Sequence, residues 1–402
     1  MAKACPTPQP LRNVLGTVLF VTLLFVLSFL ARFIFPPLFP ALKEDLGLTS
    51  AQAGSLFLLA ALAALGGSTV AGFLSSRINH RGSLLLSLFG TGAALVAAFF
   101  AREVWVLQLV FIALGVFFGL HLPSSVATVT ATVRREDWGK ALSVHQLGPP
   151  TGLVAGPLIA AAILTWFSWS TAVLAVAILI FAAGLAFFFF TGLTGGIGAF
   201  PGDPPKPAML KPVLRTRSFW LMVFLFALGM GAQVGVYSML PLYLTRERGL
   251  TFGAANTLLG LANVAPLVTA FLSGWVTARL GEKRAIGLFL PLTGAVMILV
   301  GVLEGAGLKA AIVLLAALAI CFFPPAFAAL SRTVQPTYRS LAAGFGPPTA
   351  FVLGGGLLPL GLGYLGEAAS FSLGITITGT VILVGSAAVL PLHLLTELEE
   401  GC

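Results

Sequence analysis

The sequence predicts an all-α polytopic membrane protein with twelve transmembrane helices in two pseudo-symmetric halves of six. Three observations support this prediction: the apolar composition, a repeat at half the chain length, and the distribution of lysine and arginine. Hydrophobic residues make up 58% of the 402 residues and charged residues only 9%, whereas a soluble domain carries about 25% charge. Apolar runs of roughly 20 residues can cross a bilayer as helices, which satisfy their own backbone hydrogen bonds there.

Twelve apolar segments follow one another along the chain, separated by charged residues or by glycine and proline. We expect the spans of the first half at 14–40, 51–76, 83–101, 105–131, 139–165 and 170–193. We expect those of the second half at 218–244, 251–278, 284–303, 308–332, 340–364 and 370–394. The intervening segment contains Pro-Gly-Asp-Pro-Pro and several basic residues, which is typical of a polar linker. The predicted domains are an N-terminal half at 1–193, a cytoplasmic linker at 194–217 and a C-terminal half at 218–402.

Lysine and arginine gather on one side of these spans. If both termini are cytoplasmic, the outer face receives only Lys43, Arg102, Arg246, Arg248 and Lys309. Arg32 falls inside the first span, and the rest of the 22 basic residues lie on the inner face. This positive-inside pattern predicts a multi-pass protein of the plasma or inner membrane with both termini in the cytoplasm. The net charge of +9 is therefore an orientation signal, and we expect no nucleic-acid partner.

One turn between two spans occurs twice in the chain. The first copy runs from Gly72 to Arg81 and the second from Gly274 to Arg284, with an offset of 202 between the two glycines. Matches at nearly the same offset relate the fourth span to the tenth and the fifth to the eleventh. Two repeats with an even number of spans share one orientation, so we expect them to be related by an axis along the membrane normal.

With these features the chain resembles the major facilitator superfamily of secondary transporters over essentially its whole length. In that family the loop between the second and third helices reads roughly Gly-x-Leu-x-Asp-Arg-x-Gly-Arg-Arg. The residues that fit this pattern are Gly72, Leu74, Arg77 and Arg81 in the first copy and Gly274, Arg279, Gly281, Lys283 and Arg284 in the second. The resemblance implies the major facilitator fold, and it implies gating loops at Gly72, Arg77, Arg81, Gly274, Arg279 and Arg284.

Both copies depart from this pattern at the aspartate, which is replaced by Ser76 and by Ala278. In the family this carboxylate takes part in the charge pairing that holds the inward-closed gate. We therefore do not expect that contact here in its usual form, although the fold is unaffected.

Carboxylates are absent from the predicted membrane interior, because all 13 lie in loops, tails or span ends. Proton-driven transporters often use a buried Asp or Glu, and a cationic substrate would also favour a buried anion. The sequence contains no metal-ligand cluster, no nucleotide-binding loop and no nucleophile–base pair. We therefore expect no catalytic residue, no metal and no cofactor, and the protein is not predicted to be an enzyme.

Arg32 lies inside the first span, which costs about 2.5–3.5 kcal/mol on insertion scales. One interpretation is that it snorkels to the outer interface or pairs with a helix-end carbonyl. The other is that its guanidinium clamps a carboxylate, phosphate or similar oxyanion in a central cavity. Arginine at this place resembles the organic-anion and organic-phosphate branches of the superfamily, which often carry a second arginine in the seventh helix. The mirrored residue here is Gln233, which favours a monoanion.

Further polar residues lie inside predicted spans. His121 and His145 could be hydrogen-bonded packing residues or proton carriers, because an unperturbed imidazole changes charge near pH 6.5. His121 is also a predicted substrate-binding residue, since Ser125 and Thr128 lie on the same helix face. The neutral side chains that could complete a substrate site are Gln233, Tyr237, Asn256 and Asn263. Hydrogen bonds between helices are the alternative role for these four residues.

The sequence thus predicts a secondary transporter of a small, monocarboxylate-like organic anion that works by alternating access. Its coupling is anion exchange or proton symport, its partners are the solute, protons and membrane lipids, and it acts as a monomer. One alternative is an efflux antiporter for amphipathic drugs or lipids, suggested by the motif Gly152-x-x-x-Gly156-Pro157 and by 33 phenylalanines. A further alternative is a membrane receptor or scaffold that does not transport.

Overall fold

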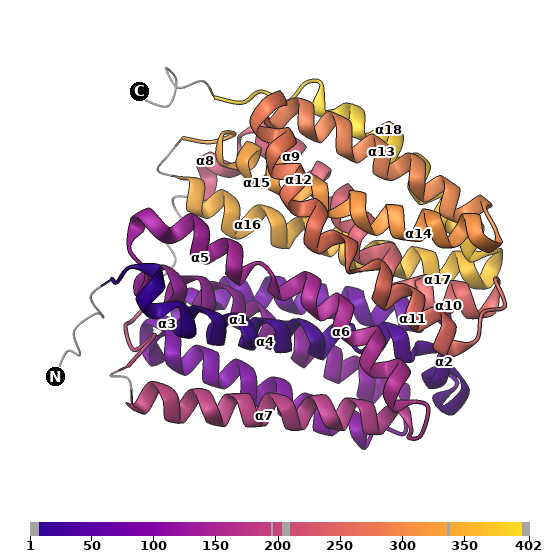
Figure 1. Ribbon diagram of the computed structural model, residues 1–402, viewed down its shortest axis with the longest axis horizontal. Coiled ribbons are helices and arrows are strands. Elements are labelled where there is room, and N and C mark those ends of the chain that lie inside the picture. The colour runs from indigo at the N-terminus through magenta and orange to yellow at the C-terminus, as the bar shows by residue number, and fades with distance from the viewer. Residues whose placement is uncertain (1–7, 194–195, 203–209, 336–337, 396–402) are drawn as a thin grey trace. The chain divides into compact units, whose positions relative to one another are not determined.

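The computed structural model describes residues 8–193, 196–202, 210–335 and 338–395. Within these residues the chain is almost entirely helical, and the one β-bridge joins Gln9 to Val133. The helices of the first part are α1 (Leu11–Phe33), α2 (Phe35–Leu46), α3 (Ser50–Phe99), α4 (Val104–Thr132), α5 (Trp138–His145), α6 (Gly148–Ile163) and α7 (Trp169–Leu193). Figure 1 shows them in indigo to magenta.

The second part begins with the short helix α8 (Leu210–Leu214) and continues with α9 (Arg217–Met230), α10 (Tyr237–Arg246), α11 (Phe252–Ala262), α12 (Ala265–Leu280) and α13 (Glu282–Val302). It ends with α14 (Gly305–Ala319), α15 (Phe323–Ser331), α16 (Arg339–Phe351), α17 (Leu358–Ala368) and α18 (Phe371–Gly385). Two π-helical segments, Gly231–Val236 and Val352–Leu357, join α9 to α10 and α16 to α17. Within the predicted linker, residues 194–195 and 203–209 lie outside the described residues.

Eleven helical stretches of the described residues are long and apolar enough to cross a membrane. One of them, Ser50–Phe99, is two spans in sequence, because the backbone leaves the helical conformation at Asn79 with φ 62° and ψ 172°. The Asn79 side chain accepts a hydrogen bond from the Gly82 N–H at 2.8 Å and so caps the second of these spans. This bend accounts for the twelve predicted spans, and the all-α polytopic fold is confirmed.

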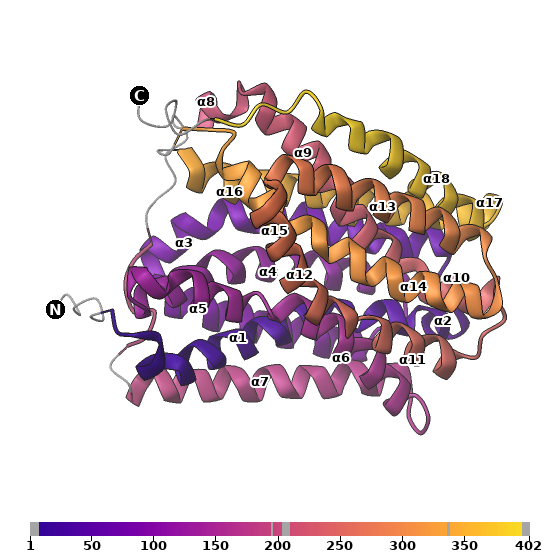
Figure 2. The ribbon, with the colours of Figure 1, turned by 45° about the horizontal axis from the view of Figure 1, so that its top comes forward.

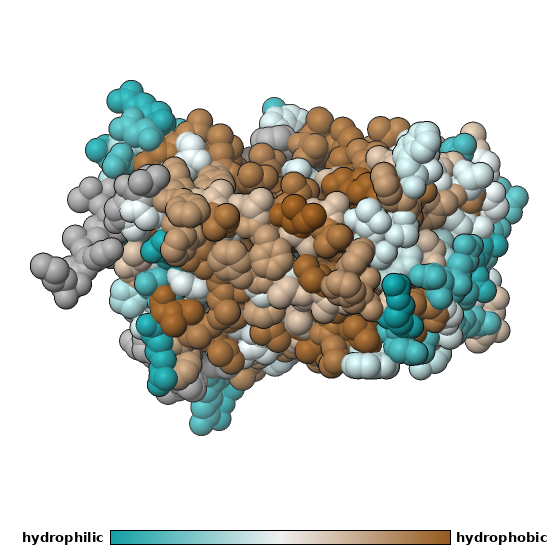
Figure 3. Space-filling model, turned by 90° about the horizontal axis from the view of Figure 1, so that it is seen from below, coloured by the Kyte–Doolittle hydropathy of each residue, from teal (hydrophilic) through white to brown (hydrophobic). Residues whose placement is uncertain are grey.

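Large apolar side chains are exposed along many of these helices, including Ile178 and Phe189 on α7 and Val268 on α12. Figure 3 shows apolar residues over the middle of one face and polar residues toward its two ends. A soluble protein rarely exposes so much contiguous apolar surface. This distribution fits a molecule whose sides face lipid.

The chain divides into two compact units. The first unit consists of Met1–Leu38 and Leu62–Pro205, and the second of Phe39–Ala61 and Lys206–Cys402. In the first unit α1 packs against α4, α5, α6 and α7, and Figures 1 and 2 show these helices running alongside one another. In the second unit α13 packs along α18, and α9 packs against α16.

Equivalent glycines make close helix contacts in the two units. A Cβ placed on Gly152 of α6 would lie 3.0 Å from the Phe29 Cβ of α1. A Cβ on Gly354, which is 202 residues further along, would lie only 2.6 Å from the Gly231 backbone nitrogen. Small residues allow membrane helices to approach closely. The repeat seen in the sequence therefore extends to its helix packing.

The second unit also contains the start of α3. The Ser50 N–H donates to Glu367 Oε1 at the end of α17, and Arg246 Nη1 donates to Ser50 Oγ at 2.9 Å. A carboxylate near a helix N-terminus satisfies an otherwise unbonded N–H and interacts well with the helix dipole. These contacts fix the first turn of α3 to α10 and α17.

Candidate functional site

Arg32 lies in the last turn of α1, in the middle of the apolar stretch Leu11–Leu46. Its side chain is buried, and its Cζ lies 3.6 Å from the ring centroid of Phe118 on α4. The rings of Phe29 and Phe33 lie at 5.5 and 5.7 Å from the same atom. A desolvated cation–π contact contributes about 2 kcal/mol, which offsets much of the cost of placing an arginine at this depth.

The three rings around Arg32 join a fourth, Phe25, in what we call the phenylalanine cluster: Phe25, Phe29, Phe33 and Phe118. Phe29 meets Phe118 edge-on at 5.3 Å and stacks with Phe33 at 5.4 Å. Phe25 stacks with Phe118 at 6.3 Å. Phe25, Phe29 and Phe33 repeat every four residues along α1, so they share one face of the helix. Such aromatic pairs add stability beyond their buried area, so the cluster forms a firm wall around the guanidinium.

The rings of the two predicted histidines both stack with the Phe25 ring. Its centroid is 4.5 Å from that of His145, at the end of α5, and 6.0 Å from that of His121 on α4. The three rings are nearly parallel, with interplanar angles of 13° and 8°. Both imidazoles are completely buried. The structure therefore brings Arg32, His121 and His145 together around one aromatic cluster of the first unit.

The hydrogen bonds of the two histidines differ. His121 Nδ1 lies 2.9 Å from Ser87 Oγ. Within the described part of the chain, His121 Nε2 and both ring nitrogens of His145 have no hydrogen-bond partner. A buried polar atom without a partner costs about 1–3 kcal/mol, and sites of this kind often serve a function. These nitrogens are the atoms at which the cluster could accept a proton or a ligand donor.

The four neutral residues of the predicted site belong to the second unit. Gln233 lies in the first π-helical segment, and Tyr237 is the buried first residue of α10. Their pairing was inferred from α-helical spacing, whereas a π-helix has more residues per turn. Asn256 is buried on α11, while Asn263 follows the end of that helix and donates from Nδ2 to the Leu259 carbonyl at 2.8 Å. Their role as substrate ligands stays a prediction.

The two repeated turns make matching contacts. In the first, the Arg77 Cζ lies over the Phe73 ring at 4.4 Å, and in the second the Arg279 Cζ lies over Trp275 at 4.0 Å. Arg81 donates from Nε to Thr191 Oγ1 at 2.6 Å, which ties the first turn to α7. The remaining predicted gating residues of the second turn, Gly274 and Arg284, are exposed. A gating role for the six loop residues stays a prediction.

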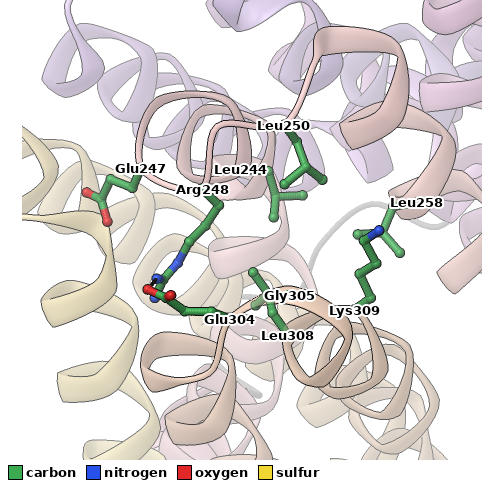
Figure 4. Close-up of a pocket in the computed structure, with 9 residues that line it drawn as sticks. All are labelled: Leu244, Glu247, Arg248, Leu250, Leu258, Glu304, Gly305, Leu308 and Lys309. Carbon is green, nitrogen blue, oxygen red and sulfur yellow. Dashed lines mark hydrogen bonds and ion pairs between the residues drawn. The ribbon is translucent and has the colours of Figure 1, made fainter.

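A separate cavity of about 310 Å³ lies in the second unit (Figure 4). It is lined by Leu244, Glu247, Arg248, Leu250, Leu258, Glu304, Gly305, Leu308 and Lys309. Figure 4 shows the Arg248 guanidinium beside the Glu304 carboxylate, with which it forms an ion pair. Burial alone would lower the pKa of Arg248, but its hydrogen bond to Tyr243 and the charge of Glu304 raise it above the ordinary value. The predicted substrate residues do not line this cavity.

Sequence reasoning missed Ser87 and two rings of the phenylalanine cluster, Phe25 and Phe118. Phe118 is one turn before His121 on α4, and Phe25 is two turns before Arg32 on α1, so helical spacing alone could have indicated both rings. Ser87 is far from His121 in the chain and gave no such signal. Within the described residues, no group of three or more His, Cys, Asp or Glu gathers that could hold a metal ion.

Comparison with known proteins identifies the fold. The family model described as Major Facilitator Superfamily matches residues 21–346. The chain belongs to this family. This major facilitator protein is 24% identical over 388 residues to a probable sulfoacetate transporter of Cupriavidus necator, with 90% of this chain and 89% of that protein aligned. It is 23% identical over 380 residues to a D-galactonate transporter of Escherichia coli, with 86% and 87% aligned.

A similar solved structure is that of a bacterial homologue of the human lysosomal transporter Spinster in an inward-facing, occupied conformation. The TM-score is 0.78 at 15% identity, with 95% of this chain and 97% of that chain covered. This likeness supports the fold alone. The family and these relatives are transporters, so the prediction that the chain is a membrane transporter and not an enzyme is confirmed.

Proposed function

We propose that this major facilitator protein carries a small organic anion by alternating access, with Arg32 as the anion anchor. The observation that supports this most directly is the position of the Arg32 guanidinium, buried halfway along a membrane span against the Phe118 ring. A guanidinium binds a carboxylate as a fork, through two N–H groups that lie in its plane. The two relatives described above are named for sulfoacetate, a dianion with a sulfonate and a carboxylate, and for D-galactonate, a monoanion. Both names support an organic anion in general, and neither fixes its charge.

The proposed substrate carries a single negative charge, on the group that binds Arg32. One arginine serves the first repeat, and the neutral Gln233 occupies the mirrored place in the second. A dianion or a phosphate would leave a charge without a buried cation, which is costly in a membrane interior. A monoanion bound by Arg32 avoids this cost.

Two modes of coupling fit the site. In anion exchange, the positive charge of Arg32 resists reorientation of the empty transporter until an anion neutralises it. In proton symport, His121 or His145 carries a proton together with the anion, since their free ring nitrogens are buried in the same cluster. Exchange requires only Arg32, and symport requires a histidine as well, so the two modes can be separated by mutation.

The distribution of basic residues supports the proposed orientation. The Arg77–Phe73 and Arg279–Trp275 pairs belong to turns rich in arginine and lysine, which the positive-inside rule assigns to the cytoplasm. We propose a plasma or inner membrane location with both termini cytoplasmic. Membrane lipids are the other partner, and the functional unit is a monomer.

Uptake by the purified protein in proteoliposomes tests the proposal. A labelled panel of monocarboxylates, dicarboxylates and phosphate is offered with preloaded anion or with an imposed pH gradient. We expect saturable uptake of monocarboxylates that falls about 100-fold in Arg32→Gln, since a bidentate charged contact contributes roughly 3 kcal/mol. Arg102→Gln, an exposed loop arginine, is the matched control and should transport normally.

Other results would contradict the proposal. Normal counterflow by Arg32→Gln would remove the anion anchor. Efflux of lipophilic dyes without any response to small anions would favour the alternative of an antiporter for amphipathic drugs or lipids. That alternative rests on the Gly152–Gly156–Pro157 motif, whose glycines here pack closely against Phe29 and Phe33 of α1. Ligand binding with no transport at all would point to a receptor.

A further inference from the structure

Three phenylalanine rings contact the Arg32 guanidinium and form what we call the aromatic wall. Phe118, Phe29 and Phe33 all lie within 6 Å of the guanidinium carbon, and Phe25 extends the cluster to the two histidines. Phe25 and Phe33 are buried, whereas Phe29 and Phe118 are half-buried. Phe29 and Phe118 are therefore the two rings of the wall that keep exposed surface.

Such a wall would discriminate between carboxylates by the chemistry of the rest of the molecule. A hydroxyl group pressed against phenylalanine loses its hydrogen bonds to water and gains none in return. A flat ring, in contrast, can pack edge-on or offset against Phe29 and Phe118, in the arrangement these two rings already adopt with each other at 5.3 Å. A site built to hold a sugar acid would instead present hydrogen-bond partners for its hydroxyls.

We infer that the substrate is an aromatic monocarboxylate, with its carboxylate on Arg32 and its ring packed against Phe29 and Phe118. This inference rests on the proposed function and narrows it from organic anions in general to acids with a flat apolar body. The D-galactonate relative shares the fold and the family, but its polyhydroxylated substrate class does not suit the wall seen here.

The first test measures binding and uptake with three carboxylates of equal charge. Benzoate has a flat aromatic body, cyclohexanecarboxylate an apolar body without a π face, and gluconate a polyhydroxylated body. We expect benzoate to compete for uptake at least about tenfold better than gluconate, with cyclohexanecarboxylate between them. Gluconate equal to or better than benzoate, with uptake still dependent on Arg32, would overturn the aromatic class while leaving the proposed function intact.

The second test uses variants of the wall. Phe118→Leu should weaken benzoate about tenfold and cyclohexanecarboxylate less, while Phe118→Trp should keep the preference because it keeps a π face. Phe189→Leu, an exposed phenylalanine on α7 outside the cluster, is the matched control. Phe29→Leu provides the same comparison if Phe118→Leu does not fold, as judged by its melting temperature.

The two proposals fail in different ways. An unchanged order of the three probes in folded Phe118→Leu and Phe29→Leu would show that these rings do not select the substrate. Absence of uptake for all three anions by the wild-type protein, or uptake that survives Arg32→Gln, would instead contradict the proposed function itself.

Discussion

Arg81 donates a hydrogen bond from Nη2 to the carbonyl oxygen of Phe188 at 3.0 Å. In the second repeat Lys283 donates from Nζ to the carbonyl oxygen of Leu390 at 2.8 Å, and both residues of this pair are 202 positions after their counterparts. In each case the basic residue of the repeated turn binds the end of the last span of its own half. A cation near the C-terminal end of a helix interacts favourably with the helix dipole.

These two hydrogen bonds, which we call the ties, should each stabilise the turn from which they start. We expect Arg81→Ala and Lys283→Ala each to lower the melting temperature by about 2–4 °C, because a hydrogen bond from a charged group contributes about 1–2 kcal/mol. Thermal unfolding of the purified protein in one detergent measures this. The control is Arg284→Ala, whose side chain is exposed; a drop of the same size in this variant would show that the ties have no special role.

The histidines should determine the response of transport to pH. If one of them carries the proton, uptake at a fixed anion gradient rises as the outside pH falls, because protonation adds the positive charge that travels with the anion. His121→Gln or His145→Gln should abolish this rise, while anion exchange at equal pH on both sides continues. Uptake that still follows the pH gradient in both variants would exclude these two imidazoles as proton carriers.

Tyr243 should be sensitive to the loss of a single oxygen. Its hydroxyl donates to the Val300 carbonyl at 2.7 Å and accepts from Arg248 Nε at 2.8 Å, and the side chain is fully buried. Tyr243→Phe leaves both partners unsatisfied, so we expect a loss of about 1–3 kcal/mol in stability. Denaturant or thermal unfolding measures it, and Tyr364→Phe, at an exposed tyrosine, should have no effect. Equal stability of the two variants would contradict this prediction.

Substituting alanine for three glycines should change the stability of the protein to different extents. Gly354→Ala should be more destabilising than Gly152→Ala, since its Cβ would meet rigid backbone at 2.6 Å, whereas that of Gly152 would meet a side-chain atom at 3.0 Å. Overpacking of this kind costs about 1–3 kcal/mol. Gly139→Ala on α5, where the new Cβ meets nothing, should stabilise its helix slightly. Expression level and melting temperature rank the three variants, and the reverse order would refute the packing argument.

Periodicity and charge predicted the spans well, because the length and apolarity of a membrane helix are set by the bilayer. The Ser50–Phe99 segment shows the limit: its bend is set by the backbone of Asn79, and no apolar pattern reveals a single residue with positive φ. The π-helical segments around Gln233 and Gly354 were also missed. They depend on where neighbouring helices force an extra residue into a turn, and this information is not local to the chain.

The ionisable residues of the site were predicted from the sequence, whereas the Phe118 ring beside them was not. Arg32, His121 and His145 stand out because ionisable groups are rare in apolar spans. Phenylalanine is common throughout this chain, so nothing in its frequency distinguishes Phe118 from the rings that face lipid. The contact of the Phe118 ring with the guanidinium, which joins two separate helices, identifies it.

The paired ties of Arg81 and Lys283 also explain how the two repeats could diverge without losing a shared contact. The acceptor in each tie is a main-chain oxygen, which every amino acid supplies. Position 188 could therefore become leucine at 390, and arginine could become lysine, while the bond itself survived. Hydrogen bonds to main-chain acceptors can therefore be conserved between two repeats even where the side chains differ. Such bonds show the duplication in the structure after the sequences have diverged.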